Sequence, residues 1–336
     1  MSGRPSASPG TAQARAAAVH PVAEVLRARA QSGSAPGARE DPHRVALVLE
    51  GGGMRGIVSA AMAAAIERLD LTRCLDLVVG SSSGALNGAA LLADVARPCA
   101  TAYATAFATR EFINPARLLR GRPALDVGYA LRHARGELDA ERHRRTVDSP
   151  IPLHCLAVDV DTAEPVVFTG MKTVDELWQV LLATSRMPWV GGDPVTIEGR
   201  RYLDGGLASP IPVGTAVAAG ATHVLVLQTR PQGVPRTTGV PFIDRLVERH
   251  LRRLNPGLAA LYRRRVADYE RVVQDIGQRT AHPGDEPPHV LGLRPPAGTP
   301  VVARLERRPP VLAGAAADAE RLVDAVFGGL AEPRPA

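Results

Sequence analysis

Two short apolar segments, each followed by a glycine- or serine-rich turn and then a helical segment of small residues, most constrain how this chain folds. The first is RVALVLE, residues 44–50, and GGGMRG separates it from an Ala-rich stretch at 57–69 that favours helix. The second is CLDLVVG, residues 74–80, which runs through SSSG into a helical segment at 84–96. This strand–helix–strand–helix order predicts a parallel sheet with helices packed on its faces.

The rest of the chain continues the same alternation, so we predict one α/β domain over residues 43–330. Within it, the segments 98–148 and 240–280 are helical, basic and broken by proline, and they are candidate caps or lids. The other expected elements are two strands within 151–170, a helix over 173–185, a hairpin over 195–206, a small helix over 212–220, a strand over 221–230, a strand over 289–296 and a helix over 313–327.

The two ends of the chain differ in composition from this domain. Residues 1–42 are dominated by Ala, Ser, Gly, Pro and Arg, which predicts a disordered tail with one helical turn near 22–30. Residues 331–336 are expected to form a short polar tail. No apolar leader segment and no run of eighteen apolar residues occurs, so we expect a cytoplasmic protein that no membrane span anchors.

The charge of the chain narrows the classes of partner, and the spacing of its cysteines indicates where they lie. The formal net charge of the 336 residues is +6, and arginine carries it almost alone because Lys172 is the only lysine. This balance fits either anionic partners such as acidic lipid head groups or an arginine-rich solvated surface. Basic residues are not interleaved with aromatic ones, so nucleic-acid binding is not expected. The three cysteines lack Cys-x-x-Cys spacing and are expected to be core residues: Cys74, Cys99 and Cys155.

The first turn has the spacing G-x-G-x-x-G at Gly51, Gly53 and Gly56. In a strand–turn–helix this is the fingerprint of a dinucleotide site, because glycines let backbone N–H groups point at an anion near a helix N-terminus. The same geometry suits the oxyanion that forms during acyl transfer. A dinucleotide site also needs an acidic residue at the end of the next strand, whereas Asp76 lies early in that strand and Gly80 ends it. A nucleotide-binding or NAD enzyme therefore remains an alternative, although the sequence lacks the acidic residue that would bind the ribose.

The second turn has the spacing G-x-S-x-G, from Gly80 to Gly84, with Ser82 at its centre. After a strand and before a helix, this spacing predicts a nucleophile elbow, in which small flanking residues let two chain segments pass closely. The N-terminus of the following helix would favour an alkoxide at Ser82. Ser81 and Ser83 are then expected to cap backbone groups. The alternative is a serine-rich turn that only caps a helix.

A nucleophilic serine needs a base, and the histidines do not follow strands as a catalytic histidine would. Eight of them lie inside or at the start of a strand or in peripheral segments: His43, His133, His143, His154, His223, His250, His282 and His289. Asp204 offers a base instead, because it ends a short strand and Gly205 and Gly206 would let its carboxylate approach another backbone. A carboxylate removed from water has a raised pKa and is a better base. The alternative for Asp-Gly-Gly is an ordinary turn.

These three motifs, in this order, resemble those of the patatin-like phospholipase family. The segment ATSRMPWV, residues 183–190, and Pro210 and Pro212 after the third motif are also similar to the family pattern, and the likeness covers roughly residues 44–230. The resemblance implies a three-layer α/β/α fold with a mostly parallel central sheet. It also implies a serine acyl hydrolase that cleaves carboxylic esters of phospholipids or related lipids through an acyl-enzyme, without a metal or cofactor.

The resemblance assigns roles to individual residues. Ser82 is the implied nucleophile and Asp204 the implied proton acceptor. Two departures are Glu50 before the glycines and Asp-Gly-Gly in place of Asp-Gly-Ala. The implied oxyanion loop is Gly51, Gly52, Gly53, Met54, Arg55 and Gly56, with Arg55 near the charged intermediate or a head-group phosphate, and the motif glycines are Gly80, Gly84, Gly205 and Gly206.

The sequence also fits two alternatives to the hydrolase. One is the nucleotide-binding enzyme, and another is a catalytically idle scaffold that binds lipid with the same fold. The basic stretch from Asp244 to Asp275 is a candidate for peripheral contact with an anionic membrane, because several arginines share helix faces with Leu and Val. The alternative for this stretch is a pair of solvated helices packed on the sheet.

Overall fold

A central β-sheet organises the structure, a computed structural model that describes residues 17–137, 140–188, 190–236 and 240–329. Within these residues the strands form one eight-stranded sheet of order β5-β6-β3-β2-β1-β7-β8, and β4 pairs with β3 outside this path. The five strands from β3 to β8 in that order run parallel, whereas β4, β5 and β6 are antiparallel additions. The strands are β1 (Val45–Leu49), β2 (Leu77–Ser81), β3 (Leu153–Asp159), β4 (Pro165–Phe168), β5 (Val195–Ile197), β6 (Arg200–Asp204), β7 (His223–Leu227) and β8 (His289–Leu293).

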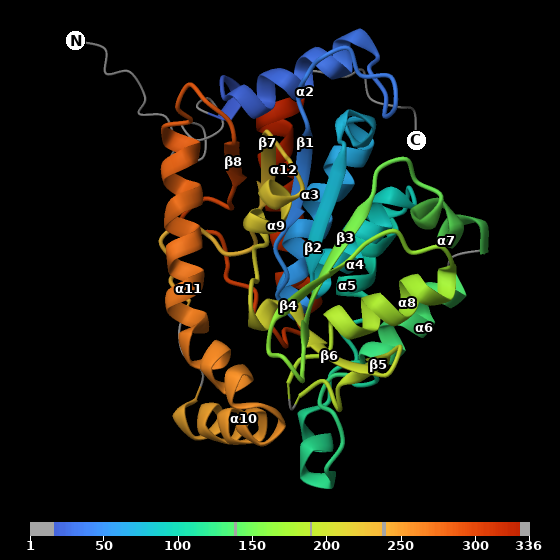
Figure 1. Ribbon diagram of the computed structural model, residues 1–336, viewed down its shortest axis with the longest axis vertical. Coiled ribbons are helices and arrows are strands. Elements are labelled where there is room, and N and C mark those ends of the chain that lie inside the picture. Colours follow the sequence, from blue (N-terminus) through green and yellow to red (C-terminus); the bar gives the residue numbers. More distant parts are fainter. Residues whose placement is uncertain (1–16, 138–139, 189, 237–239, 330–336) are drawn as a thin grey trace.

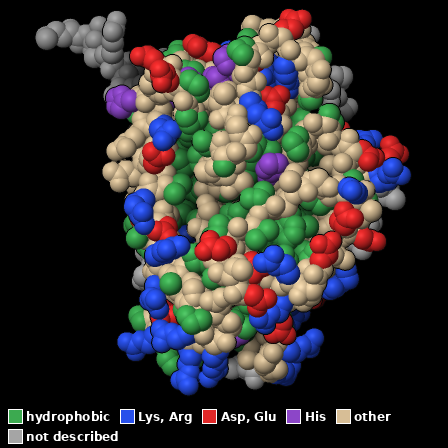
Figure 2. Space-filling view, viewed as in Figure 1, with side chains coloured by type: hydrophobic (Ala, Val, Ile, Leu, Met, Phe, Trp, Pro, Cys, Tyr) green, Lys and Arg blue, Asp and Glu red, His purple; other side chains and the backbone are tan. Residues whose placement is uncertain are grey.

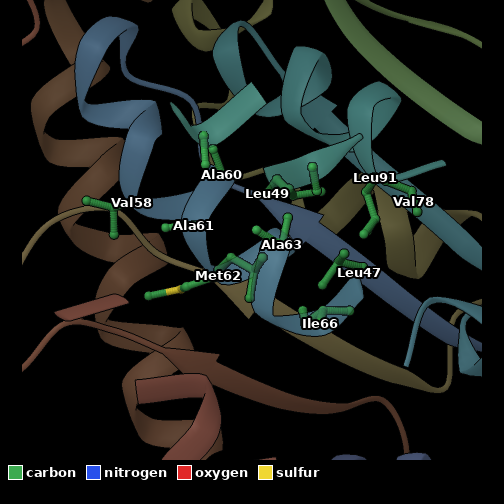
Figure 3. Close-up of a cluster of buried hydrophobic side chains, with 14 of the residues drawn as sticks. Leu47, Leu49, Val58, Ala60, Ala61, Met62, Ala63, Ile66, Val78 and Leu91 are labelled. Carbon is green, nitrogen blue, oxygen red and sulfur yellow. The ribbon is translucent and has the colours of Figure 1, made fainter. Parts of the chain in front are cut away.

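Helices cover both faces of this sheet, as the predicted three-layer α/β/α fold requires (Figure 1). Side chains of β1 alternate between the layers: Leu47 and Leu49 pack with α3, α4 and α12, and Ala46 and Val48 pack with α9 and α11. Figure 3 shows Leu47 and Leu49 beside the small residues of α3. The helices are α2 (Pro21–Ser32), α3 (Ile57–Arg68), α4 (Ser83–Leu92), α5 (Ala96–Ala104), α6 (Val127–Glu137), α7 (Ala140–Val147), α8 (Val174–Thr184), α9 (Val213–Ala218), α10 (Pro241–Leu254), α11 (Pro256–Ala281) and α12 (Pro309–Phe327).

Short 3₁₀ helices occupy several turns, including the two turns after β1 and β6. The segment predicted as one candidate cap, 98–148, contains α5, α6 and α7, and the other, 240–280, contains α10 and α11, which Asn255 separates. None of the described helices combines the length and apolar character that crossing a membrane requires. The 3₁₀ helices are η1 (Gly53–Gly56), η2 (Thr72–Cys74), η3 (Pro115–Arg120) and η4 (Gly205–Leu207).

The expectation of a disordered tail over residues 1–42 is wrong for the part of it that the structure describes. Helix α2 packs against β7, β8 and α12 through Val22, Ala23 and Leu26. Arg29 is only 1% exposed, and its guanidinium bonds to Asp41 and to Asp76 at 2.8 and 2.7 Å. A buried arginine with two carboxylate partners holds this segment against the start of β2. Residues 1–16 and the predicted tail at 331–336 lie outside the described residues.

The order of the strands determines where a site forms. The chain runs from β1 outward to β2 and β3, and later places β7 and β8 on the other side of β1. Ligand sites in such sheets lie beyond the carboxyl ends of the strands where the order reverses. Strand β3 also brings the ends of β2 and β6 together, because its Leu156 pairs with Ser81 and its Ala157 pairs with Asp204.

Candidate active site

Ser82 lies in a sharp turn between β2, which ends at Ser81, and α4, which begins at Ser83. Its backbone has φ 57° and ψ −134°, a conformation that costs a residue with a side chain about 1–3 kcal/mol. A hydrogen bond from Ser82 N–H to Thr184 Oγ1 at 3.0 Å holds the turn, and Thr184 in turn donates to the carbonyl of Leu156. The neighbouring strand and α8 therefore fix the strained turn that the G-x-S-x-G spacing predicts.

The two glycines of this turn are places where backbones approach too closely for a side chain. A Cβ on Gly84 would lie 2.2 Å from the carbonyl oxygen of Leu49, and one on Gly80 would lie 2.5 Å from the nitrogen of Ala85. Helix α4 therefore begins almost in contact with the end of β1. This packing brings the turn against the glycine loop that follows β1.

Asp204 ends β6 and is only 4% exposed. Gly206 N–H donates to its Oδ1 at 2.7 Å, and a Cβ on Gly205 would lie 2.0 Å from the carbonyl oxygen of Leu156, so the Asp-Gly-Gly turn rests directly on β3. Burial raises the pKa of Asp204 to about 6, while hydrogen bonds from the Ser82 hydroxyl and from Gly206 N–H oppose the rise. The Ser82 hydroxyl and the Asp204 carboxylate are therefore direct neighbours.

The loop between β1 and α3 passes beside this pair. Gly52 N–H donates to Ser83 Oγ at 2.9 Å, and Met54 N–H donates to the carbonyl of Arg304 at 3.0 Å. Gly51 N–H has a longer bond of 3.4 Å to Pro210 O, and Arg55 N–H donates back to Gly52 O. Gly53 N–H finds no acceptor among the described residues. Gly53 has φ 60°, which suits glycine.

Arg55 belongs to a buried polar network in the wall of the site. Its Nε donates to Thr229 Oγ1 at 3.0 Å, and its guanidinium lies 3.9 Å from Glu50 Oε1. Glu50 also accepts from Thr229 N–H at 2.6 Å and from the Tyr269 hydroxyl at 3.1 Å. Burial lowers the pKa of Arg55 to about 10, so it stays protonated at neutral pH. Glu50, which departs from the family pattern, is the counter-ion of Arg55 here.

One cavity of about 550 Å³ contains Ser82 and Asp204 in its lining. One part of its wall is apolar and includes Met187, Leu207 and Val247, and another part is rich in arginine. An apolar wall beside a charged one suits an amphiphilic ligand. A second cavity, of about 610 Å³, lies between α4, α5, α6 and α8, and neither Ser82 nor Asp204 lines it.

The structure brings most of the predicted site residues to this cavity. Gly51, Gly52, Gly53, Arg55 and Gly206 line it together with Ser82 and Asp204. Met54 is buried in the core, and Gly56 lies against Ser83 and Tyr103 instead. Gly80, Gly84 and Gly205 act through close backbone packing. No described histidine lines the cavity.

Only one of the two flanking serines has the expected role of capping a backbone group. Ser83 Oγ accepts from Gly52 N–H and so joins the turn to the glycine loop. Capping by Ser81 is wrong, because its buried Oγ has no hydrogen-bond partner within the described residues. Ser81 is the last residue of β2 and is buried in the lining of the same cavity, with its Oγ 3.6 Å from a Cβ placed on Gly206.

Several residues of the site were not expected from the sequence. Thr184 lies in the segment ATSRMPWV, so its family resemblance could have marked it. Asn87 donates to Gly56 O at 2.8 Å and accepts from the Tyr103 hydroxyl at 3.0 Å, which ties α4 and α5 to the glycine loop. Arg304 lies about 250 residues after that loop and belongs to no motif, so only the fold reveals it.

Three comparisons relate the chain to known proteins. The family model described as patatin-like phospholipase matches residues 47–217. The uncharacterized protein YjjU of Escherichia coli K12 is 33% identical over 195 residues, which are 56% of this chain and 53% of that protein. The chain thus spans about half the length of this relative. The crystal structure of VipD from Legionella pneumophila aligns with 84% of this chain and 67% of its own at 10% identity and a TM-score of 0.37.

Proposed function

The chain belongs to the patatin-like phospholipase family, a family of lipid acyl hydrolases, and from this premise we propose that it cleaves carboxylic esters of phospholipids or related lipids with Ser82 as nucleophile and Asp204 as base. The observation that carries the proposal is that Ser82, in its strained turn, and the buried Asp204 carboxylate line the same cavity, where the Ser82 hydroxyl is close enough to lower the pKa of Asp204. A raised pKa of about 6 makes this carboxylate a stronger base than an exposed one, yet leaves it mostly ionised at neutral pH.

The proposed reaction has two halves. Ser82 Oγ attacks the ester carbonyl carbon while Asp204 takes the hydroxyl proton, and Gly53 N–H, which has no acceptor within the described residues, donates to the resulting oxyanion. Asp204 then gives the proton to the departing alcohol as the ester C–O bond breaks and an acyl-enzyme remains. Water attacks this acyl-enzyme, Asp204 takes and returns a proton in the same way, and a fatty acid leaves from the restored Ser82.

The two alternatives to the hydrolase would use the glycine loop and Ser82 differently. A nucleotide-binding enzyme would use the N–H groups of the glycine loop for phosphate, but those of Gly52 and Met54 already donate to Ser83 Oγ and to Arg304 O. A catalytically idle lipid-binding scaffold would keep the cavity without an activated serine. The reactivity of Ser82 separates both from the hydrolase.

The test is intact-mass spectrometry after incubation with a fluorophosphonate, together with hydrolysis of p-nitrophenyl butyrate. We expect one adduct on the wild-type protein and none on Ser82→Ala, whose turnover should fall by at least about 1000-fold. Ser81→Ala is the matched control, because Ser81 is buried beside Ser82 without a hydrogen-bond partner in the described residues, and it should still be labelled. An adduct on Ser82→Ala, or none on the folded wild type, would contradict the proposal.

We further infer that the mouth of the cavity meets a phospholipid surface. Six exposed apolar residues form what we call the α10 surface: Val240, Phe242, Ile243, Leu246, Val301 and Leu305. Four of them, Val240, Ile243, Val301 and Leu305, also line the cavity, so the α10 surface is continuous with the site. An exposed apolar patch beside a cavity for lipid is typical of an interfacial contact.

The charge around the α10 surface favours an anionic membrane. Arg245, Arg249 and Arg253 are exposed on the same helix, and they have no carboxylate within 4 Å among the described residues. Figure 2 shows basic side chains gathered at the end of the molecule where α10 lies, and within α10 all of these are arginines. Basic residues around an apolar face attract acidic lipid head groups. We therefore include in this proposal that the protein is cytoplasmic and contacts the membrane peripherally.

A further inference from the structure

The wall of the catalytic cavity carries more positive than negative charge. Five arginines line it, against the three carboxylates Glu50, Asp204 and Asp244. Even with all three carboxylates ionised, the described lining has an excess of two positive charges. The arginines are Arg55, Arg230, Arg236, Arg265 and Arg304.

Only two of these arginines have a carboxylate of their own. Arg55 lies 3.9 Å from Glu50, and Arg265 lies 2.7 Å from Asp244. No carboxylate of the described residues comes within 4 Å of the guanidinium groups of Arg230, Arg236 or Arg304. Ion pairs are the usual way in which a protein stabilises clustered arginines. Three guanidinium groups in one cavity without such partners therefore leave room for an anion from outside the protein.

The fold holds two of the three groups in fixed positions. The guanidinium groups of Arg230 and Arg236 lie over the ring of Tyr269, at 5.8 and 5.2 Å from its centre. Arg236 is buried and donates to the carbonyl of Arg265 at 3.2 Å, and the buried Nε of Arg230 has no acceptor within the described residues. Groups fixed by stacking lose little conformational entropy when they bind an anion.

Arg304 connects this cluster to the catalytic residues. Its carbonyl accepts from Met54 N–H in the glycine loop, while its side chain lines the cavity and makes no hydrogen bond to the described residues. Its charge acts on both Asp204 and Arg236. Arg304 is exposed at the wall of the cavity, so an anion can reach its guanidinium and would offset the repulsion from Arg236 and Arg230.

We infer that Arg230, Arg236 and Arg304 form an anion subsite of the catalytic cavity, and that it binds a phosphate group carried by the ester substrate. The inference rests on the proposed hydrolase function and specifies its substrate class: acyl esters that carry a phosphate near the scissile bond, in preference to neutral acylglycerols. Guanidinium groups suit this role because they bind phosphate oxygens through paired, charge-assisted hydrogen bonds.

The first experiment compares two substrates that differ only in the phosphate, 1-oleoylglycerol 3-phosphate and 1-oleoylglycerol, in the same nonionic detergent micelles. We expect kcat/KM of the wild type to be about 10- to 100-fold higher for the phosphorylated ester, the size of one or two charged hydrogen bonds. Arg304→Gln should reduce this ratio at least tenfold, whatever its effect on the neutral ester. Arg236→Gln should act in the same direction.

Arg307→Gln is the matched control, because Arg307 is exposed three residues further along the chain and does not line the cavity. It should keep the wild-type ratio. A ratio near one for the wild type, or an unchanged ratio in both Arg304→Gln and Arg236→Gln, would overturn the assignment. Thermal melting of each variant separates loss of the subsite from loss of the fold.

The second experiment does not depend on turnover. Calorimetric titration of Ser82→Ala with glycerol 3-phosphate and with inorganic phosphate should give binding that the additional change Arg304→Gln weakens at least tenfold. Phosphate binding together with a substrate ratio near one would mean a site for free phosphate and would overturn the substrate assignment. If the wild type is not labelled by fluorophosphonate, the proposed hydrolase fails, and Arg304-dependent phosphate binding would then report the anion site separately.

Discussion

At the scale of single residues, the site combines a strained backbone and a buried carboxylate, and each of them costs stability. Ser82 keeps a positive φ of 57°, and Asp204 keeps a carboxylate almost out of water. Neither arrangement stabilises the fold, and the hydrogen bonds of Thr184 and Gly206 hold both in place. Strain and desolvation that are maintained in one cavity are typical of catalytic groups.

The raised pKa of Asp204 predicts how activity depends on pH. Below about pH 6 the carboxylate is protonated in the folded protein and cannot accept the Ser82 proton. We therefore expect kcat/KM for p-nitrophenyl butyrate to rise with pH through about 6 and to level off by about pH 7.5. Initial rates between about pH 3 and pH 8.5 check this. Asp204→Asn should remove both the activity and its pH dependence.

The pH at which kcat/KM rises decides whether Asp204 is the desolvated base. An exposed aspartate would give a transition near its usual value of about 4, two units lower than the value expected here. Since the charge of Arg304 lowers the pKa of Asp204, Arg304→Gln should move the transition to higher pH. A transition near pH 4 in the wild type would show that Asp204 is not the desolvated base.

At the scale of elements, close backbone packing explains why the motif glycines occur where they do. A Cβ on Gly84 would meet the carbonyl oxygen of Leu49, and a Cβ on Gly205 would meet that of Leu156. Backbone atoms within a sheet cannot move aside as a flexible side chain would. The turns that carry Ser82 and Asp204 thus depend on the absence of a side chain.

Gly84→Ala should therefore lower stability by about 1–3 kcal/mol and reduce fluorophosphonate labelling, because α4 must shift away from β1. Gly214→Ala is the control, since Gly214 lies in helix α9 with nothing within 4 Å of the added Cβ. That change should leave labelling intact and stabilise the protein by about 0.5–1 kcal/mol. Urea unfolding and labelling rates measure both effects. Equal stability of the two variants would refute the packing argument.

Elements that follow from local sequence patterns could be predicted, whereas those that depend on distant contacts could not. The strands, the Ser82 turn and Asp204 follow from local patterns, because apolar runs, glycine spacing and Asp-Gly-Gly each act within a few residues. Helix α2 was expected only as one helical turn near 22–30, because its anchor, Arg29, pairs with Asp41 and with the more distant Asp76. Arg304 was missed for a related reason: it meets the glycine loop only through the folded chain.

At the scale of the whole molecule, the two ends of the sheet carry different surfaces. Helix α2 lies at one end, and α10 lies at the other end, where the cavity opens (Figure 1). The apolar wall of the cavity continues outward into the α10 surface, and the exposed arginines of α10 surround it. Lipid esters from an anionic bilayer would then reach Ser82 without crossing water.

Vesicle binding tests this orientation, with Phe242 as the decisive residue because it is 68% exposed on α10 and does not line the cavity. We expect Phe242→Ser to weaken binding to vesicles of phosphatidylcholine and phosphatidylglycerol about tenfold, since burying one such ring is worth about 1.5–3 kcal/mol. Val217→Ser, an exposed change on α9, should bind like the wild type. Co-sedimentation measures binding, and vesicles of phosphatidylcholine alone should bind more weakly. Equal binding of Phe242→Ser and Val217→Ser would show that α10 does not face the membrane.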